Sequence, residues 1–163
     1  MQSLTERDLR ASFVNASRRE ATQAPVPSDL DQLEWDDLDV LGWTDPKAPQ
    51  RAYVVVPTAS GPVGLLLRTE SRGSTRPALC DWCQDPQATD GVVLYVARRA
   101  GAAGRQGNTI GAMMHADLGC SRHARRRPTP EEAGLDPEAF VAGRIDGLRA
   151  RAARFAERAR DGD

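Results

Sequence analysis

Two short metal-ligand motifs constrain this chain more than any other feature of its sequence. Cys80 and Cys83 form a Cys-x2-Cys pair, and Cys120 and His123 form a Cys-x2-His pair 36 residues later. Three thiols and one imidazole in two such pairs are typical of a tetrahedral Zn²⁺ site. We therefore expect one zinc ion bound by Cys80, Cys83, Cys120 and His123. Because four protein ligands leave no position for water, the expected role of this zinc is structural.

Three other interpretations of these residues remain open at this point. The cysteines and histidine could be buried and surface residues without a metal, and Cys-x2-Cys alone also occurs in redox proteins. The matching second pair, which uses the third and last cysteine, favours zinc over both. His115, five residues before Cys120 in an apolar segment, is a competing fourth ligand. We prefer His123 because its spacing from Cys120 matches the recurrent pair.

Composition and termini limit the class of protein. The chain has 163 residues, of which 40% are hydrophobic and only 5% aromatic, so a bound metal would help to stabilise a modest core. No apolar run approaches the ~20 residues that span a bilayer, and the N-terminus lacks the features of a secretory signal. An odd number of cysteines with metal-like spacing argues for a reducing compartment. We expect a cytoplasmic protein without a membrane partner.

Charge is distributed unevenly along the chain. Residues 1–50 carry 5 basic and 10 acidic side chains, whereas residues 51–130 carry 11 basic and 5 acidic ones. A basic segment around the metal site favours an anionic partner, either RNA or an acidic protein face. The alternative is that the segments neutralise each other within the fold. The arginines that could contact a partner are Arg98, Arg99, Arg105, Arg122, Arg125, Arg126 and Arg127.

Helical patterns are expected at both ends of the chain. Ser3 and Glu6 form a potential capping box for a first helix, which should end before Pro25. Asp136 as N-cap and Pro137 at the first helical position mark the start of a final helix. Its apolar residues recur at steps of three and four and should cover a sheet; they are Val141, Ile145, Leu148, Ala152, Phe155 and Ala159.

Strand patterns dominate the middle of the chain. The β-rich segments 51–56 and 63–69 flank a turn and predict a hairpin. Segments 91–99 and 108–115 predict two more strands, joined by a Gly- and Ala-rich loop. Residues 71–77 are expected to form a polar loop. The acidic, Trp-containing segment 29–46 predicts a helical turn and a loop anchored on the sheet by Trp35, Leu38 and Trp43.

The sequence offers no constellation of catalytic residues. The chain has two histidines, one of which is assigned to zinc, and no Ser/His/Asp set or open metal site can be assembled from the remainder. The spaced glycines Gly101, Gly104 and Gly107 lack the lysine and following helix of a phosphate-binding loop. We therefore expect a non-enzymatic protein with no small-molecule substrate.

The order of the predicted elements is that of a treble-clef zinc finger: a zinc knuckle, two strands, and a second ligand pair leading toward helix. The sequence also resembles the elongation factor G-binding protein family, and more narrowly the treble-clef domain of the FusB-type fusidic acid resistance proteins. Four blocks carry the resemblance: Leu41-Gly42-Trp43-x-Asp45-Pro46, Tyr53-Val54-Val55-Val56, Cys80-Asp81-Trp82-Cys83 and Cys120-Ser121-Arg122-His123.

This resemblance implies a fold, a domain organisation and a function. The expected fold is α+β: a treble-clef zinc finger with a small antiparallel β-sheet, an N-terminal helix and a long C-terminal helix. Residues 1–27 would form the N-terminal helix and linker, and residues 28–163 the zinc-binding domain. The resemblance implies binding to elongation factor G and modulation of its release from the ribosome, with a role in fusidic acid resistance. An RNA- or ribosome-binding zinc finger is the alternative.

Overall fold

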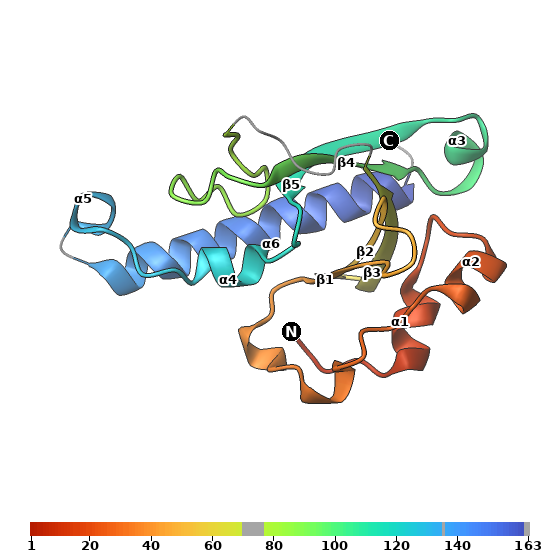
Figure 1. Ribbon diagram of the computed structural model, residues 1–163, viewed down its shortest axis with the longest axis horizontal. Helices are drawn as coiled ribbons and strands as arrows, with labels where there is room; N and C mark the ends of the chain where they lie inside the picture. The colour runs from red at the N-terminus through yellow and green to blue at the C-terminus, as the bar shows by residue number, and fades with distance from the viewer. Residues whose placement is uncertain (70–76, 135, 162–163) are drawn as a thin grey trace.

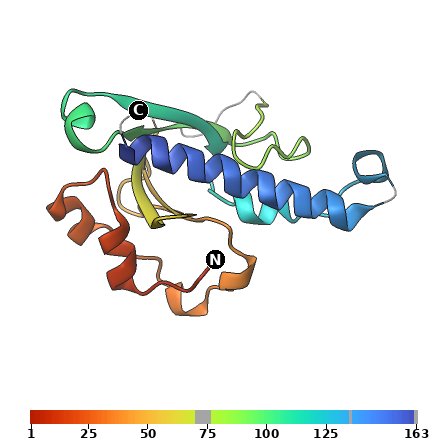
Figure 2. The same ribbon diagram turned by 180° about the vertical axis from the view of Figure 1, so that it is seen from behind.

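A five-stranded antiparallel sheet lies between a long C-terminal helix and two short N-terminal helices (Figures 1 and 2). This computed structural model describes residues 1–69, 77–134 and 136–161. The strands follow chain order across the sheet: β1 (Leu41–Thr44), β2 (Arg51–Thr58), β3 (Gly61–Arg68), β4 (Val92–Arg98) and β5 (Thr109–His115). The α+β fold predicted from the sequence is therefore confirmed.

Strands β2 to β5 confirm the predicted strand segments, and their alternating residues separate the two faces of the sheet. Val54, Leu65 and Leu67 are buried in the main core together with the inward residues of β4 and β5. The opposite face of β2 and β3 presents Tyr53 and Leu66 to the N-terminal segment. Of the polar loop predicted over residues 71–77, residues 71–76 lie outside the described part of the chain.

Helix α6 (Pro137–Asp161) covers the main-core face of the sheet and confirms the predicted stripe. Leu148, Ala152, Phe155 and Ala159 are buried in the same cluster as the strands. Its start is also as predicted, since the Ala139 amide donates to Asp136 Oδ1 at 2.9 Å. None of the helices in the described residues is long and apolar enough to cross a membrane.

The N-terminal segment differs from the single helix that was predicted. It forms α1 (Glu6–Ser12) and α2 (Arg18–Gln23), each with its own capping box. Thr5 and Asp8 cap α1 in place of Ser3 and Glu6. Between these helices the chain is extended, because Phe13 bridges Gly64 of β3 and the Val14 amide donates to the Gly64 carbonyl. The helix is interrupted where the chain pairs with the sheet.

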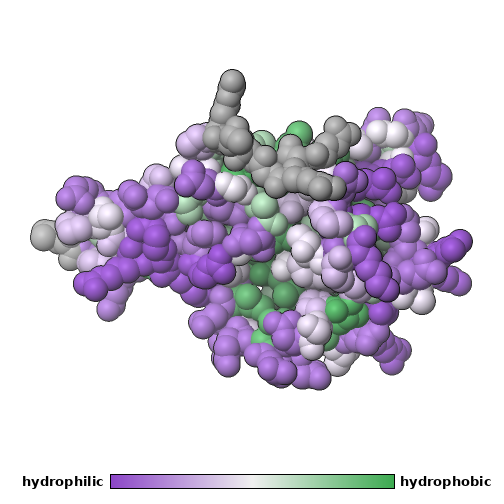
Figure 3. Space-filling model, in the orientation of Figure 1, coloured by the Kyte–Doolittle hydropathy of each residue, from purple (hydrophilic) through white to green (hydrophobic). Residues whose placement is uncertain are grey.

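Strand β1 was predicted as part of a loop. Leu41 pairs with Val55, and the predicted anchors Trp35, Leu38 and Trp43 do pack in one cluster with these two residues. Two 3₁₀ turns precede the strand, at Leu30–Gln32 and Trp35–Asp37. In the view of Figure 3 most of the surface is hydrophilic, and hydrophobic residues gather in small groups beside this N-terminal segment.

Asn15 fills a gap in the middle of the sheet. Strands β3 and β4 pair only at Leu67–Ala97 and Arg68–Val96, and diverge beyond these pairs. The Asn15 amide bridges the divergence: its Nδ2 donates to the carbonyls of Leu66 (3.0 Å) and Arg98 (2.9 Å), and its Oδ1 accepts from the Leu66 amide (2.8 Å). One side chain thus replaces the missing hydrogen bonds between the strands.

Replacing Asn15 by alanine is expected to lower the free energy of unfolding by about 1–3 kcal/mol, because partly buried backbone groups lose their hydrogen-bond partners. Urea denaturation of the zinc-loaded protein measures this loss. The exposed Asn108 provides the matched control, and Asn108→Ala should change stability by less than about 0.5 kcal/mol. Equal stabilities for the two variants would show that Asn15 does not support the sheet.

Candidate metal centre

Three separate parts of the chain bring the metal-ligating residues together. Cys80 and Cys83 lie in the knuckle before β4, and this knuckle docks on the edge strand β5. The Asp81 amide donates to the Met113 carbonyl, and the Met113 amide donates to Asp81 Oδ2, both at 2.7 Å. His115 ends β5, and Cys120 begins helix α4 (Cys120–Ala124). The site therefore ties the knuckle to β5 and to α4.

The four clustered donors are the sulfurs of Cys80, Cys83 and Cys120 and a ring nitrogen of His115. All four residues are buried, and the donor atoms lie within 4.8 Å of one another. The Cys80 and Cys120 sulfurs are 3.6 Å apart, and His115 Nδ1 lies 3.6 Å from the Cys83 sulfur. Tetrahedral Zn²⁺ with bonds of ~2.3 Å to sulfur and ~2.0 Å to nitrogen separates its ligands by roughly 3.5–3.8 Å. The residues present fit one structural zinc.

Hydrogen bonding orients the imidazole of His115 for this role. Its Nε2 lies 2.6 Å from the Ala88 carbonyl, which requires Nε2 to carry the proton. Nδ1 then has a free lone pair directed at the cysteine sulfurs. A carbonyl that fixes the tautomer in this way is the usual outer partner of a metal-bound histidine.

Crowding of the three thiols also favours a bound cation. Contacts with Cys120 and Cys83 lower the pKa of Cys80, whereas contacts with Cys80 and Cys83 raise the pKa of Cys120 well above its ordinary value. In the absence of a cation, one thiolate therefore forms at the expense of another. Zn²⁺ would offset the repulsion between neighbouring thiolates, because its charge stabilises all three of them together.

The prediction that His123 is the fourth ligand requires correction. His123 lies on α4 one turn after Cys120, but its ring stacks on His115 with a centroid distance of 4.0 Å and an interplanar angle of 19°. It is not among the four clustered donors. Burial lowers the pKa of His123, which favours the neutral ring. His123 therefore packs beside the site.

Comparison with known proteins also indicates a zinc-binding domain. Residues 8–159 match the family described as the FBP C-terminal treble-clef zinc-finger. The chain belongs to this family. No curated protein matches the sequence significantly.

Among solved structures, the treble-clef chain is similar to one titled "Structure of the fusidic acid resistance protein FusC". The TM-score is 0.57 and the sequence identity is 15%, so the likeness concerns the fold. The match covers 90% of this chain but 59% of the FusC chain. The treble-clef chain thus spans less than two thirds of that protein.

The zinc site of this treble-clef domain is joined to α6 through the knuckle. Arg151 Nε donates to the Trp82 carbonyl at 2.7 Å, and the Trp82 ring meets Phe155 edge-to-face at 5.7 Å. Trp82 and Phe155 are both buried in the main core. Loss of the metal would therefore disturb the packing of the helix as well as the knuckle.

Two backbone positions next to the ligands adopt a conformation that is rare for their residue types. Gln84 follows the knuckle with φ of 52°, and Leu118 precedes Cys120 by two residues with φ of 56°. A left-handed conformation is unusual for a residue as bulky as leucine. Leu118 is nevertheless 5% exposed and packs over β1, where a Cβ at Gly42 would lie 2.6 Å from its own Cβ.

The arginines predicted to contact a partner fall into two groups. Arg122 pairs with Asp117, and Arg125 and Arg126 pair with the fully buried carboxylates of Asp39 and Asp85. The Arg99 guanidinium donates to the Arg158 carbonyl. The side chains exposed to solvent without an ion pair to described residues are Arg98, Arg105 and Arg127.

The carboxylates that hold these arginines were not recognised from the sequence. Asp39 accepts from Arg125 of the α4 C-cap and from Arg149 of α6, while Ser121 Oγ accepts from the Asp39 amide. Asp85 binds Arg126, which also pairs with Glu132 of α5 (Pro130–Ala133). The run of basic residues after the metal site thus serves mainly to fasten α4 to the rest of the fold.

Proposed function

We propose that this protein is a cytoplasmic, non-enzymatic zinc protein that binds elongation factor G and modulates its release from the ribosome. The observation that carries the proposal is the closed Cys₃His site within a treble-clef domain of the FBP family. A tetrahedral ion with four protein ligands has no vacant position for a substrate or a water nucleophile. Zinc at this site would shape a binding surface, and the activity would belong to the partner.

Similarity to the FusC fold supports a partner in translation. Because this chain spans 59% of the FusC chain, factor binding and fusidic acid resistance are separate expectations. The RNA-binding alternative rests on the excess of basic residues in segment 51–130, and the run Arg125, Arg126 and Arg127 was expected to contribute to it. Since Arg125 and Arg126 are paired with buried carboxylates, that run offers less free charge to RNA than its sequence suggests.

Zinc-loaded protein is expected to bind purified elongation factor G from the same source with a dissociation constant between nanomolar and micromolar. Isothermal titration calorimetry measures this binding, and Cys80→Ser should abolish it because the fold is lost. A titration with total RNA is the matched comparison. Absence of heat from folded, zinc-loaded protein mixed with the factor would contradict the proposal, as would tight binding to RNA alone.

A further inference from the structure

The N-terminal segment covers only half of the sheet face on which it packs. Phe13, Ala16 and Ala24 cover Tyr53 and Leu66 of β2 and β3. On β4 and β5 the residues of this same face are exposed or half-buried: Leu94, Val96, Arg98, Thr109, Gly111 and Met113. Leu94 is 48% exposed, one of two large hydrophobic side chains with such exposure among the described residues.

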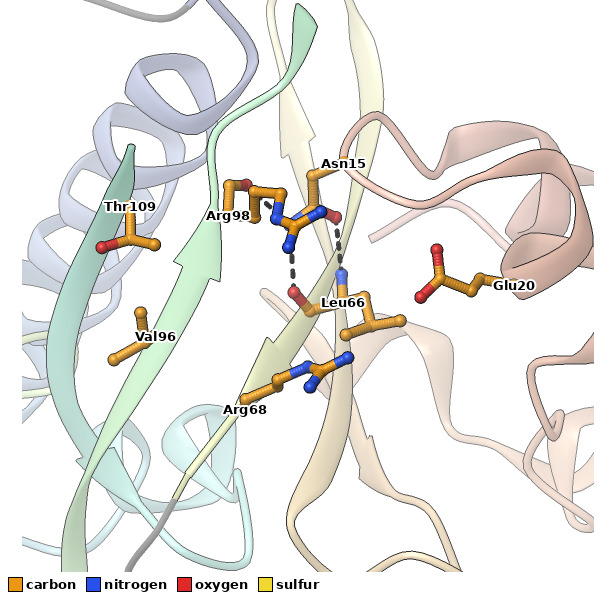
Figure 4. Close-up of a pocket in the computed structure, with 7 residues that line it drawn as sticks. All are labelled: Asn15, Glu20, Leu66, Arg68, Val96, Arg98 and Thr109. Atoms are coloured by element: carbon orange, nitrogen blue, oxygen red, sulfur yellow. Dashed lines mark hydrogen bonds between the residues drawn. The ribbon is translucent and has the colours of Figure 1, made fainter. Parts of the chain in front are cut away.

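A notch of about 180 Å³ lies where the covered and open halves of this face meet (Figure 4). The N-terminal segment supplies Asn15 and Glu20, and three neighbouring strands supply Arg68, Arg98 and Thr109. Asn15 is fixed in place by its hydrogen bonds to Leu66 and Arg98. The wall of the notch is therefore held by the sheet and does not depend on a free loop.

The notch carries two positive charges and one negative charge, and its arginines are exposed to solvent. Within the described residues, neither Arg68 nor Arg98 has a hydrogen bond or ion pair to its guanidinium, and both side chains are exposed. The one acid in the notch, Glu20, is engaged by the cap of α2, where its Oε2 accepts from the Ser17 amide at 2.9 Å. Hydrogen bonds from Ser17, with the nearby Arg51 and Arg68, lower the pKa of Glu20, so the carboxylate is ionised at neutral pH.

Two guanidinium groups against one engaged carboxylate leave the notch with a net attraction for an anion, and arginine is well suited to bind carboxylates. The open sheet beside the notch is aliphatic. Among its outward residues on β4 and β5 there is no aromatic side chain on which a base could stack. An exposed leucine on the same face of the sheet as two arginines without an ion pair to described residues is complementary to a protein surface that presents both a carboxylate and apolar residues.

We propose that the open half of the sheet is the docking surface for the protein partner, and that the notch receives a carboxylate side chain of that partner. This inference rests on the proposed binding of elongation factor G. Leu94 provides the apolar contact, and Arg68 and Arg98 provide charge and orientation. The zinc knuckle lies at the far end of the same strands, where it fixes the position of β5 through Met113.

The test compares charge reversal in the notch with the same reversal on the opposite side of the sheet. The variant Arg68→Glu with Arg98→Glu is expected to weaken binding of elongation factor G at least about tenfold, because a desolvated arginine contact is lost and a like charge is introduced. Adding Leu94→Ser should raise the dissociation constant further, because the apolar contact is also lost. The control variant carries Arg154→Glu and Arg158→Glu on α6, both exposed, and should bind as the unmodified protein does.

Zinc content and thermal melting of each variant establish that the fold is retained before affinities are compared. If the unmodified protein binds the factor and the notch variant binds equally well, the docking surface is wrong while the proposed function stands. If the unmodified protein does not bind, both proposals are wrong. If the notch variant loses affinity for ribosomal RNA but not for the factor, the notch recognises phosphate and the protein partner is excluded from it.

Discussion

Replacing His115 by alanine is expected to release the zinc and unfold the domain. His115 supplies the only nitrogen among the four clustered donors, and structural zinc contributes about 10–16 kcal/mol of apparent binding free energy in small domains. The variant should contain less than one zinc per chain after mild chelation and should lose its cooperative thermal transition. Elemental analysis and circular dichroism measure the two effects.

His123→Ala is the matched control, because the two rings stack on each other and only one of them belongs to the donor cluster. This variant should retain one zinc per chain and lose only about 1 kcal/mol from ring packing. The opposite pattern, with zinc retained in His115→Ala and lost in His123→Ala, would restore the Cys-x2-His assignment.

Replacing Asp85 by alanine is expected to lower the free energy of unfolding by about 3–5 kcal/mol, because it removes the carboxylate beside the buried Arg144 and one of the two carboxylates that hold the partly buried Arg126. The Asp85 side chain is fully buried and accepts two hydrogen bonds from Arg126 Nε and Nη2 at 2.9 and 2.8 Å. Arg144, itself 8% exposed, lies 3.8 Å from the same carboxylate. Denaturant unfolding of the zinc-loaded proteins measures the loss.

Asp146→Ala is the control for this effect, since Asp146 is 79% exposed and lies 3.8 Å from Arg149. Its loss should change stability by less than about 0.5 kcal/mol. Similar losses for the two variants would show that burial of the Asp85 pair is unimportant.

The contribution of Asp85 should depend on pH in a defined direction. Burial raises the pKa of Asp85, but hydrogen bonds from Arg126 and from the Gln87 amide outweigh burial and lower it overall. A lowered pKa in the folded state stabilises the protein above the unfolded pKa of about 3.9, and this contribution disappears as the pH falls through the folded value. The difference between the unmodified protein and Asp85→Ala should therefore stay constant from pH 7 to about 5 and decrease below that.

Most strands and the last helix were predictable because their signals are local. The continuous apolar run in segment 51–56 and the alternation of apolar residues in segment 108–115 each predict a strand, and Asp136 with Pro137 marks a helix start. Strand β1 has no such signal. Leu41–Thr44 is only four residues long and becomes a strand because it pairs with β2.

In the metal site, too, some ligands are evident from the local sequence, whereas the fourth ligand depends on a contact between residues far apart in the chain. Three ligands were evident from the sequence because cysteine is rare in this chain. The choice between the two histidines depended on a distant contact, the carbonyl of Ala88 that orients His115. A histidine at the end of an apolar strand, next to a turn that leads to a cysteine, was the available signal, and the pair spacing of His123 outweighed it.

Arginine roles could not be predicted from charge alone. Arg125 and Arg126 are adjacent in a basic run, yet they bind carboxylates 86 and 41 positions away in the chain. Sequence shows that a charge is present but does not show its partner. Asp39 lies in an acidic segment and Asp85 in a turn-rich one, and their burial distinguishes them from exposed acidic residues.

The left-handed residues Gln84 and Leu118 have a consequence for what a bound metal ion would stabilise. Strained backbone of this kind persists only where the surroundings hold it, and here the surroundings are the ligand-bearing turns themselves. A zinc ion bound by Cys83 and Cys120 would hold both turns in place and so offset the cost of these two conformations. Part of the free energy of zinc binding would therefore act on the backbone of the two turns as well as on the ligands themselves.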